Sequence, residues 1–523
     1  MTDGGFVACK PHRRRASFLS AARGGIQICS LEALIMSMTA RRFAMVVLAF
    51  LSLGCGVLWS AALKAGAAKA TITPDVKATK VYMAGFDNNR VATGVHDDLY
   101  VRCLALEAGH QTLALCEVDV IGLFYDDVLK VREKVKAQAP EVTEVIVASS
   151  HDHEGPDTLG LWGPTPLESG MDEKYMDWLD DRITSTALQA VHSMQDARMT
   201  LARDDHPLLA MLQSDSRPPY VKDPYLFVMQ LTSVAGDHPI ATLVNWSDHP
   251  ETLGGHNTLI TADFPNWLCQ YVEDHDGGTA VFFQGSIGGL LSTLGDDVAL
   301  QDPETGRVAK DGTWRKAELF GVTVGELATR ALKNGQDALV DSLVIRKAVI
   351  FAPLDNDHFR AAAALNIYKD RKRLYTDGRV DSSTAEKVFP GLGKLQCATG
   401  HDLQTEVDYI QLLSRGQALA EITTVPGEIY PELVNGGITR YPGADFPEAP
   451  LEPTLRAHLH SRYQFVFGLA NDELGYIIPK AEWDNQPPWL QNKKDRWYGE
   501  INSAGEEVAG AVTRALVRLM EQE

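Results

Sequence analysis

The sequence lacks a basic surplus, which argues against nucleic acids as binding partners. Its 523 residues contain 49 Lys and Arg against 69 Asp and Glu, a formal net charge of −20. Residues 1–65 carry a balance of +6, so the remainder of the chain carries −26. Binding to DNA or RNA needs a basic face that offsets the phosphate charge. The acidic body leaves a small-molecule or lipid-like substrate open.

Cysteine is scarce, with seven residues in the whole chain, and no spacing indicates a cysteine metal site. Four follow the N-terminal region: Cys103, Cys116, Cys269 and Cys397. Cys103 and Cys116 lie in consecutive strand-like runs, equidistant from a turn at Gly109-His110. A hairpin would therefore place them opposite each other. We expect two buried thiols here, and a cross-strand disulfide in an oxidising compartment is the alternative.

One long apolar run lies near the N-terminus. Arg41-Arg42 precede an apolar stretch from Phe43 to Leu63, which leads into small residues. This order is typical of a secretory signal, and we predict cleavage near Ala65 or Ala67. A run of about 21 residues can also span a bilayer, so a retained membrane anchor is the alternative.

The leader divides the chain into two predicted regions. Residues 1–67 form an N-terminal extension with the signal peptide or anchor, and residues 68–523 form one folded domain. Met38 would begin a conventional leader, so residues 1–37 are excluded from the fold prediction. The protein is therefore expected to be exported, either periplasmic or secreted, with the apolar segment as a potential membrane anchor.

The folded region has no low-complexity linker and no internal repeat, and strand-like and helix-like segments alternate along it. Helices are predicted at residues 126–137, 175–194, 315–332 and 504–521, and strands at 145–149, 225–231, 240–245, 279–283 and 343–350. The polar stretch 355–408 is predicted to be irregular, as a lid or an insertion. The pattern predicts an α/β fold with mixed β-sheets flanked by helices.

A pair of histidines follows the most strand-like run. His151 and His153 come directly after the β-branched segment Val145–Ser149. At that spacing, both imidazoles can face the crevice beyond the carboxyl ends of a sheet. They could bind a metal together, or one could bind it while the other moves protons. A polar loop with solvated histidines is the alternative for an isolated pair.

Similar strand exits recur along the chain. His249 follows an apolar strand at 241–246, Glu428 follows one at 419–425, and Tyr476 follows one at 465–469. Alone, His249 is more often structural, and Glu428 suits the start of a helix. Imidazole and carboxylate together suit zinc, and these exits predict a zinc site at the carboxyl ends of strands. Ser286 also follows a strand, but its surroundings are not G-x-S-x-G and indicate a turn lining the same crevice.

In order, these motifs resemble the neutral (alkaline, non-lysosomal) ceramidases, zinc amidases that cleave the N-acyl bond of ceramide. The resemblance runs from about Ala68 to near the C-terminus. Gly94–Tyr100 resembles the family's G-x-H-x-x-L-Y run, and His151–Pro156 resembles its H-T-H-S-G-P. Thr424–Glu428 resembles M-P-G-E, and Asn471–Ile478 resembles N-x-Y-x-x-Y-x-T-T.

The resemblance implies four Zn²⁺ ligands: His151, His249, Glu428 and Tyr476. It implies that His153 moves protons, taking one from water and returning it to the leaving amine. Arg217 and Tyr498 resemble residues that contact the reacting carbonyl, where each donor would contribute about 3–4 kcal/mol. A surface turn is the alternative for Arg217.

Two features depart from the family. Its long members carry a further β-sandwich domain, for which we expect no room before Glu523. Asp157–Trp162 and Pro250–Leu253 replace small-residue runs that should border the substrate. Metal-dependent hydrolysis is therefore better supported than ceramide as the substrate.

The sequence is compatible with three functions. The first is an exported zinc hydrolase that cleaves the N-acyl amide of ceramide or a related N-acyl lipid, in sphingolipid or other lipid metabolism. The second is a hydrolase of the same fold that acts on esters or other small molecules. The third is an exported, non-catalytic binding protein. A lipid-like substrate is compatible with association at a membrane surface, and no feature of the sequence specifies an oligomeric state.

Overall fold

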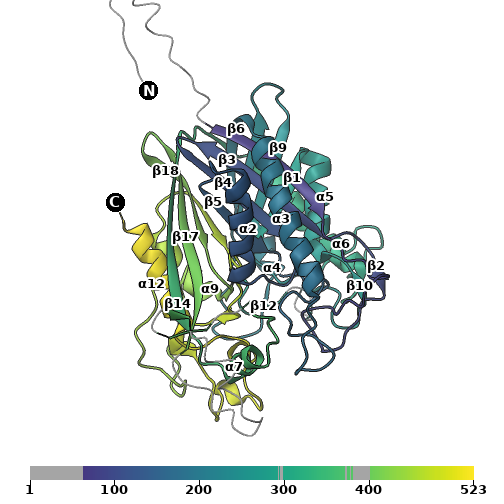
Figure 1. Ribbon diagram of the computed structural model, residues 1–523, viewed down its shortest axis with the longest axis vertical. Coiled ribbons are helices and arrows are strands. Elements are labelled where there is room, and N and C mark those ends of the chain that lie inside the picture. The colour runs from purple at the N-terminus through teal and green to yellow at the C-terminus, as the bar shows by residue number, and fades with distance from the viewer. Residues whose placement is uncertain are drawn as a thin grey trace, which may run out of the picture. The chain divides into compact units, whose positions relative to one another are not determined.

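The structure is a computed structural model that describes residues 63–291, 294, 298–371, 374–376, 379–380 and 401–522. Most of the predicted leader and Cys397 lie outside these residues. The described chain forms four layers, in the order helices, large sheet, smaller sheet and helix (Figure 1). This confirms the predicted α/β fold with mixed sheets flanked by helices.

The large sheet has nine strands in the described part of the chain, in the order β11-β9-β8-β6-β1-β3-β4-β5, with β13 beside β6. The strands are β1 (Leu63–Thr71), β3 (Tyr100–Ala108), β4 (Gln111–Val118), β5 (Glu144–Ser149), β6 (Gln195–Asp204), β8 (Leu226–Ser233), β9 (Pro239–Trp246), β11 (Thr279–Gln284) and β13 (Gln336–Ala338). β4 pairs with β5 and β9 with β11 in parallel, and the other neighbours are antiparallel.

The smaller sheet has six strands among the described residues, in the order β16-β15-β17-β18-β20, with β14 beside β17. They are β14 (Ser342–Pro353), β15 (Leu374–Thr376), β16 (Arg379–Val380), β17 (Asp402–Ser414), β18 (Gln417–Thr424) and β20 (Tyr463–Phe467). Three short pairs complete the strands: β2 (Gly94–Val95) with β10 (Leu259–Ile260), β7 (Ser214–Asp215) with β12 (Leu290–Leu291), and β19 (Glu428–Ile429) with β21 (Tyr476–Ile477).

Helices cover the outer faces of both sheets. Those on the large sheet are α2 (Tyr125–Gln138), α3 (Glu173–His192), α5 (Asp263–Asp276) and α6 (Trp314–Leu332), and α12 (Val508–Met520) covers the smaller sheet. The shorter helices are α4 (Pro207–Met211), α7 (Asp357–Ala364), α9 (Pro431–Asn435), α10 (Leu455–His458) and α11 (Tyr498–Ile501), with 3₁₀ turns η1 (Lys480–Glu482) and η2 (Leu490–Asn492). No helix in the described part of the chain is long and apolar enough to cross a bilayer.

Side-chain alternation explains how the layers pack. On β4, Leu113 and Leu115 join the core between the two sheets, while Ala114 and Cys116 face the helices. Across the inner core, Phe465 and its neighbours on the smaller sheet contribute apolar side chains. Strands buried on both faces carry apolar residues at successive positions, as β4 does.

Strand β1 extends across the predicted boundary at residue 68. It begins at Leu63 and pairs with β3 along its whole length. Its small residues have a packing function, since a Cβ on Gly66 would lie 2.2 Å from the carbonyl oxygen of Ala190 on α3. Cleavage at Ala65 or Ala67 would therefore remove part of a central strand, and the cleavage site stays a prediction.

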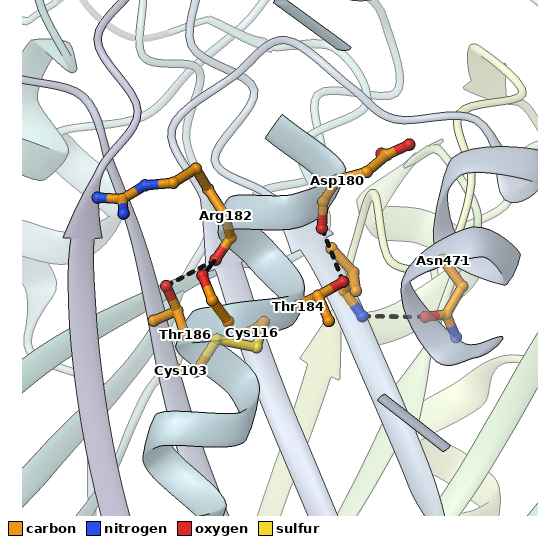
Figure 2. Close-up of a disulfide and its surroundings, with 9 residues drawn as sticks. Cys103, Cys116, Asp180, Arg182, Thr184, Thr186 and Asn471 are labelled. Atoms are coloured by element: carbon orange, nitrogen blue, oxygen red, sulfur yellow. Dashed lines mark hydrogen bonds between the residues drawn. A yellow bond between two sulfur atoms is a disulfide. The ribbon is translucent and has the colours of Figure 1, made fainter. Parts of the chain in front are cut away.

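The hairpin prediction is confirmed, but the predicted thiols are wrong. Cys103 pairs with Cys116 across β3 and β4, and the two form a disulfide. The pair lies beneath α3, close to Arg182 and Thr186 (Figure 2). The register explains the outcome, because it holds the two Cα atoms 4.1 Å apart in the buried core.

The stretch 355–408 is more regular than expected. It contains helix α7, the short strands β15 and β16, and the first residues of β17, which starts at Asp402. Residues 381–400 lie outside the described chain. β17 pairs antiparallel with β14, a long-range contact that local polarity does not reveal, and with β18 across the short turn at Arg415-Gly416.

Candidate metal centre

Two loops from the large sheet supply the histidines. His151 and His153 follow β5, and His249 follows β9. Gln284, at the end of β11, ties these loops together. Its amide nitrogen donates to Ser150 O at 2.8 Å and to Asp248 O at 2.6 Å, while its amide oxygen accepts from the backbone of Asp248 at 3.3 Å. β5 and β11 lie at opposite ends of the strand order, so the sheet curls to bring these ends together.

The smaller sheet supplies the oxygen ligands. Glu428 follows β18 and Tyr476 follows β20, two parallel neighbours. Glu428 and Tyr476 are themselves direct partners in the short β19–β21 pair. Asn471 joins this half of the site to β5, since its amide oxygen accepts from Val147 N at 3.1 Å and its backbone N–H donates to Val147 O at 2.7 Å.

The four predicted ligands come together in the structure. Glu428 Oε2 lies 3.0 Å from His249 Nε2 and 3.4 Å from His151 Nε2. Tyr476 Oη lies 3.5 Å from His249 Nε2. Zinc ligands at about 2.0 Å define a tetrahedron with edges of about 3.3 Å, which these separations match. The donor set and these three separations therefore fit a small divalent transition-metal ion.

Backbone carbonyls orient the two ligand histidines. His151 Nδ1 lies 2.8 Å from Ile121 O, and His249 Nδ1 lies 2.6 Å from Leu290 O. A carbonyl can only accept, so each Nδ1 carries a proton, and the neutral form of each ring is the one that can present its Nε2 lone pair to a metal. His151 takes a left-handed backbone conformation, with φ of 66°, to leave the strand at this angle.

Charge in the site supports cation binding. Burial raises the pKa of Glu428, but its attraction to His151 and His249 and its hydrogen bonds with them outweigh burial and lower this pKa to about 2. Burial and the nearby charge of Glu428 raise the pKa of the Tyr476 phenol well above its usual value. Glu428 therefore supplies negative charge, and a cation is what would favour the phenolate form of Tyr476.

His153 lies beside the two histidines predicted as ligands, and one ring nitrogen from each of the three lies within 4.8 Å of the others. Neither ring nitrogen of His153 has a hydrogen-bond partner among the described residues. Burial, and then the neighbouring histidines, lower its pKa well below the usual value. A neutral imidazole with free nitrogens suits proton transfer, the role predicted for this residue.

Close packing fixes the His153 ring. A Cβ on Gly85 would lie 2.4 Å from His153 Cγ, and the φ of Gly85 is +94°, so glycine is required on both counts. The Phe86 ring meets the His153 ring edge-on at 5.3 Å between centroids. The backbone N–H of His153 donates to Pro250 O at 3.1 Å, and the Arg90 guanidinium donates to the backbone carbonyl of His153.

Two cavities meet at the site. The apolar cavity lies beside His151, Glu428 and Tyr476. Its apolar lining includes Phe124, Leu159, Leu161, Trp162, Phe359 and Tyr368, with Glu473 and Asn502 among its polar members. The second cavity is lined by Asp87, Glu251 and His256 among others. His153, Tyr476 and Tyr498 line both cavities.

Tyr498 and Arg217 differ in their placement. Tyr498 is 60% exposed, and its ring centroid lies 5.8 Å from that of Tyr476. Arg217 is buried and donates to Glu500 Oε1 at 2.6 Å and to the carbonyl of Glu482. Arg217 is not among the described residues that line either cavity. Its predicted contact with a substrate carbonyl stays a prediction.

Ser286 is part of the supporting structure. Its hydroxyl donates to Asp223 Oδ2 at 2.7 Å, and its backbone N–H donates to Ser247 Oγ at 2.9 Å. The side chain is fully buried in this network. The structure thus places Ser286 in a hydrogen-bonded turn, where, among the described residues, its hydroxyl bonds to Asp223 and not to the histidine that would activate a serine nucleophile.

Solved structures share this architecture. The chain is similar to a neutral ceramidase from Pseudomonas aeruginosa, with 16% sequence identity and a TM-score of 0.58. It is also similar to a ceramidase complexed with C2, with 16% identity and a TM-score of 0.60. Each comparison covers 88% of this chain and 74% of the ceramidase chain. The fold is ceramidase-like. No family model and no curated protein matches the sequence.

Two residues beside the candidate metal centre, Gln284 and Glu251, are not among the site residues that the sequence predicts. The sequence predicts only a turn around Ser286, although the position of Gln284 at the end of a strand-like run is a usable signal. Glu251 belongs to the segment Pro250–Leu253, for which the sequence predicts only a place at the border of the substrate. It lies two residues after His249, and its carboxylate is 3.6 Å from His153 Nδ1.

Proposed function

We propose that the protein is a zinc-dependent hydrolase that cleaves the N-acyl amide bond of a lipid-like substrate, ceramide or a related N-acyl lipid. The observation that carries the proposal is the spacing of His151 Nε2, His249 Nε2 and Glu428 Oε2, with Tyr476 Oη beside them. The ceramidase-like fold supports the reaction class.

Each residue of the site has a separate role in the proposed hydrolysis. Bound zinc would polarise the substrate carbonyl and lower the pKa of water to about 7. His153 takes a proton from the attacking water and delivers it to the leaving nitrogen. Tyr498 lines both cavities and can donate its phenol hydrogen to the developing oxyanion. Arg217 is left out of this chemistry because Glu500 and Glu482 already occupy its guanidinium.

The apolar cavity supports an acyl-chain substrate. Its aromatic and aliphatic walls lie next to three of the four ligands, so an acyl group bound there would place its carbonyl near the site. Burying each CH₂ group contributes about 0.8 kcal/mol, which favours long chains over short ones. A soluble ester with a short acyl group would gain little from this cavity.

We also propose that the protein is exported. The Cys103–Cys116 disulfide supports this location, because such bonds persist in oxidising compartments and are rare in the cytosol. The basic and apolar order before residue 63 supports it independently. Association with a membrane surface would follow from the lipid-like substrate and from a leader that is retained.

Metal analysis tests the first part of the proposal. We expect about one zinc per chain in the purified wild type and loss of zinc in His151→Ala. His110→Ala, in the exposed hairpin turn between β3 and β4, is the matched control and should keep its zinc. No metal in the wild type after zinc loading would refute the zinc hydrolase.

Turnover tests the substrate. Fluorescent ceramide, a simpler N-acyl amide and an ester with the same acyl chain should be compared with the wild type and His151→Ala. We expect amide cleavage that requires His151. Cleavage of the ester alone would reject the amidase and favour an esterase. Tight binding without turnover would favour an exported binding protein.

A further inference from the structure

Glu251 is a buried carboxylate beside the proposed metal centre. Its side chain lies in the loop after β9, and one oxygen is 3.6 Å from His153 Nδ1. The other oxygen, Oε1, has no hydrogen-bond partner in the part of the chain that the structure describes. Both residues are nine-tenths or more buried and line the second cavity.

Backbone contacts hold the two side chains together. His153 N donates to Pro250 O at 3.1 Å, which fastens the loop after β5 to the residue before Glu251. The backbone N–H of Glu251 donates to His249 O at 3.0 Å. Gly85 and Phe86 pack against the His153 ring from the loop that carries them. The Glu251 carboxylate and the His153 imidazole therefore lie together because the loop after β5, the loop after β9 and the loop that carries Gly85 hold one another in place.

We propose that Glu251 is a positioning residue that accepts the Nδ1 hydrogen of His153. Accepting this hydrogen fixes the His153 tautomer and leaves the Nε2 lone pair free for the attacking water. A carboxylate in this place also stabilises the imidazolium that forms when Nε2 takes the proton. The role rests on the proposed hydrolase function and adds the residue that orients its proton carrier.

The proton transfer balances within this arrangement. One water O–H bond breaks and its proton moves to His153 Nε2 while a C–O bond forms at the carbonyl carbon. The same proton then passes from Nε2 to the nitrogen as the C–N bond breaks, which releases a neutral amine. Glu251 gains and loses no proton in either step. Its contribution is therefore largest when the leaving group needs protonation.

The chain offers a matched set of variants. Glu251→Gln keeps the size and removes the charge, and Glu251→Asp keeps the charge with a shorter side chain. Glu141→Gln makes the same glutamate-to-glutamine change at an exposed residue before β5 that lines neither cavity. Each variant is loaded with zinc, and its zinc content is measured before any assay.

Turnover is compared on an alkyl amide and on a para-nitrophenyl ester with the same acyl chain. Nitrophenolate leaves without a proton, so the ester bypasses the second transfer. For Glu251→Gln we expect kcat to fall by about 10–100-fold on the amide and by a smaller factor on the ester, which still needs the first transfer, with KM changed by less than about threefold. Glu251→Asp should recover part of the amide activity, and Glu141→Gln should match the wild type on both substrates.

A spectroscopic measurement addresses the positioning directly. NMR of isotope-labelled histidine ring nitrogens, with His153→Gln for assignment, reports which nitrogen carries the proton. In metal-free protein we expect a single Nδ1–H tautomer for His153, replaced by mixed tautomers in Glu251→Gln. This readout does not need turnover, so it tests the positioning even where the hydrolase proposal fails.

Several results would overturn the role of Glu251. Equal losses on amide and ester in Glu251→Gln would indicate a general structural defect. Loss of zinc from that variant would make Glu251 a metal ligand, and a rise in KM alone would make it a substrate-binding carboxylate. An unchanged His153 tautomer in Glu251→Gln would reject the positioning itself. A wild type that cleaves neither substrate would instead reject the hydrolase.

Discussion

Replacing Gln284 with leucine should loosen the metal centre without touching a ligand. The Gln284 amide makes hydrogen bonds of 2.8, 2.6 and 3.3 Å to the loops that precede His151 and His249. Leucine has a similar size but makes none of them. The carbonyls of Ser150 and Asp248 and one backbone N–H would then lose this side-chain partner in the interior.

The magnitude follows from the contacts that are lost. A buried polar group without a partner costs about 1–3 kcal/mol, so three groups with some relaxation give a loss of about 3–5 kcal/mol in the free energy of unfolding. The two histidine loops also lose their common anchor. Changes to the partners that support metal ligands typically weaken metal binding by about 10–100-fold.

Two measurements check this prediction. Urea unfolding of the metal-free protein gives the stability change, and a competitive chelator titration gives the zinc affinity. Gln230→Leu on β8 is the control, because Gln230 is half-buried and its amide donates to Thr242 Oγ1 at 3.2 Å, away from the site. If Gln284→Leu matched Gln230→Leu in both measurements, the proposed anchoring by Gln284 would be refuted.

Three further predictions concern other parts of the chain. Burial, and then the charge of Asp127, raise the pKa of Asp180 to about 7, whereas the unfolded value is about 3.9. The folded state therefore holds the Asp180 proton more tightly than the unfolded state does. The folded protein loses stability as pH rises from the unfolded pKa to the folded pKa. Urea unfolding from about pH 5 to 8 should show Asp180→Asn losing roughly 2–3 kcal/mol less than the wild type, and parallel curves would contradict this. Replacing both Cys103 and Cys116 with alanine should lower the unfolding free energy by up to about 3 kcal/mol in urea, whereas unchanged stability would show that the hairpin alone fixes the register. Trp162→Ala should raise KM for long-chain amides by about tenfold or more with little effect on short ones, and a uniform change across chain lengths would place the acyl group elsewhere.

Local patterns predicted the parts of this structure that depend on neighbouring residues. The β-branched run before His151 became β5, and the turn at Gly109-His110 set the register of Cys103 against Cys116. Strand exits also placed Glu428 and Tyr476 beyond the ends of apolar strands, and the family resemblance then implied that they are ligands. These signals need no knowledge of distant pairing.

Distant packing decided the features that the sequence did not reveal. Helix α5 was not predicted, and the start of β17 was hidden in a polar stretch because its pairing with β14 is long-range. The small residues around Gly66 are typical of the end of a leader. In the structure, the missing side chain of Gly66 lets α3 pack closely against β1. Arg217 lies in a polar segment whose side-chain direction depends on Glu500, far along the chain. The position of these elements and the direction of these side chains depend on tertiary contacts rather than on the local sequence pattern.

The division of the metal site between two sheets has a consequence for how the protein matures. His151 and His249 come from the first half of the chain, whereas Glu428 and Tyr476 arrive with the smaller sheet near its end. A partly synthesised chain, or one threading through a translocation channel, holds at most a fragment of the ligand set. An exported enzyme of this design would therefore acquire its metal after translocation, and the metal supply of the destination compartment would govern its activity.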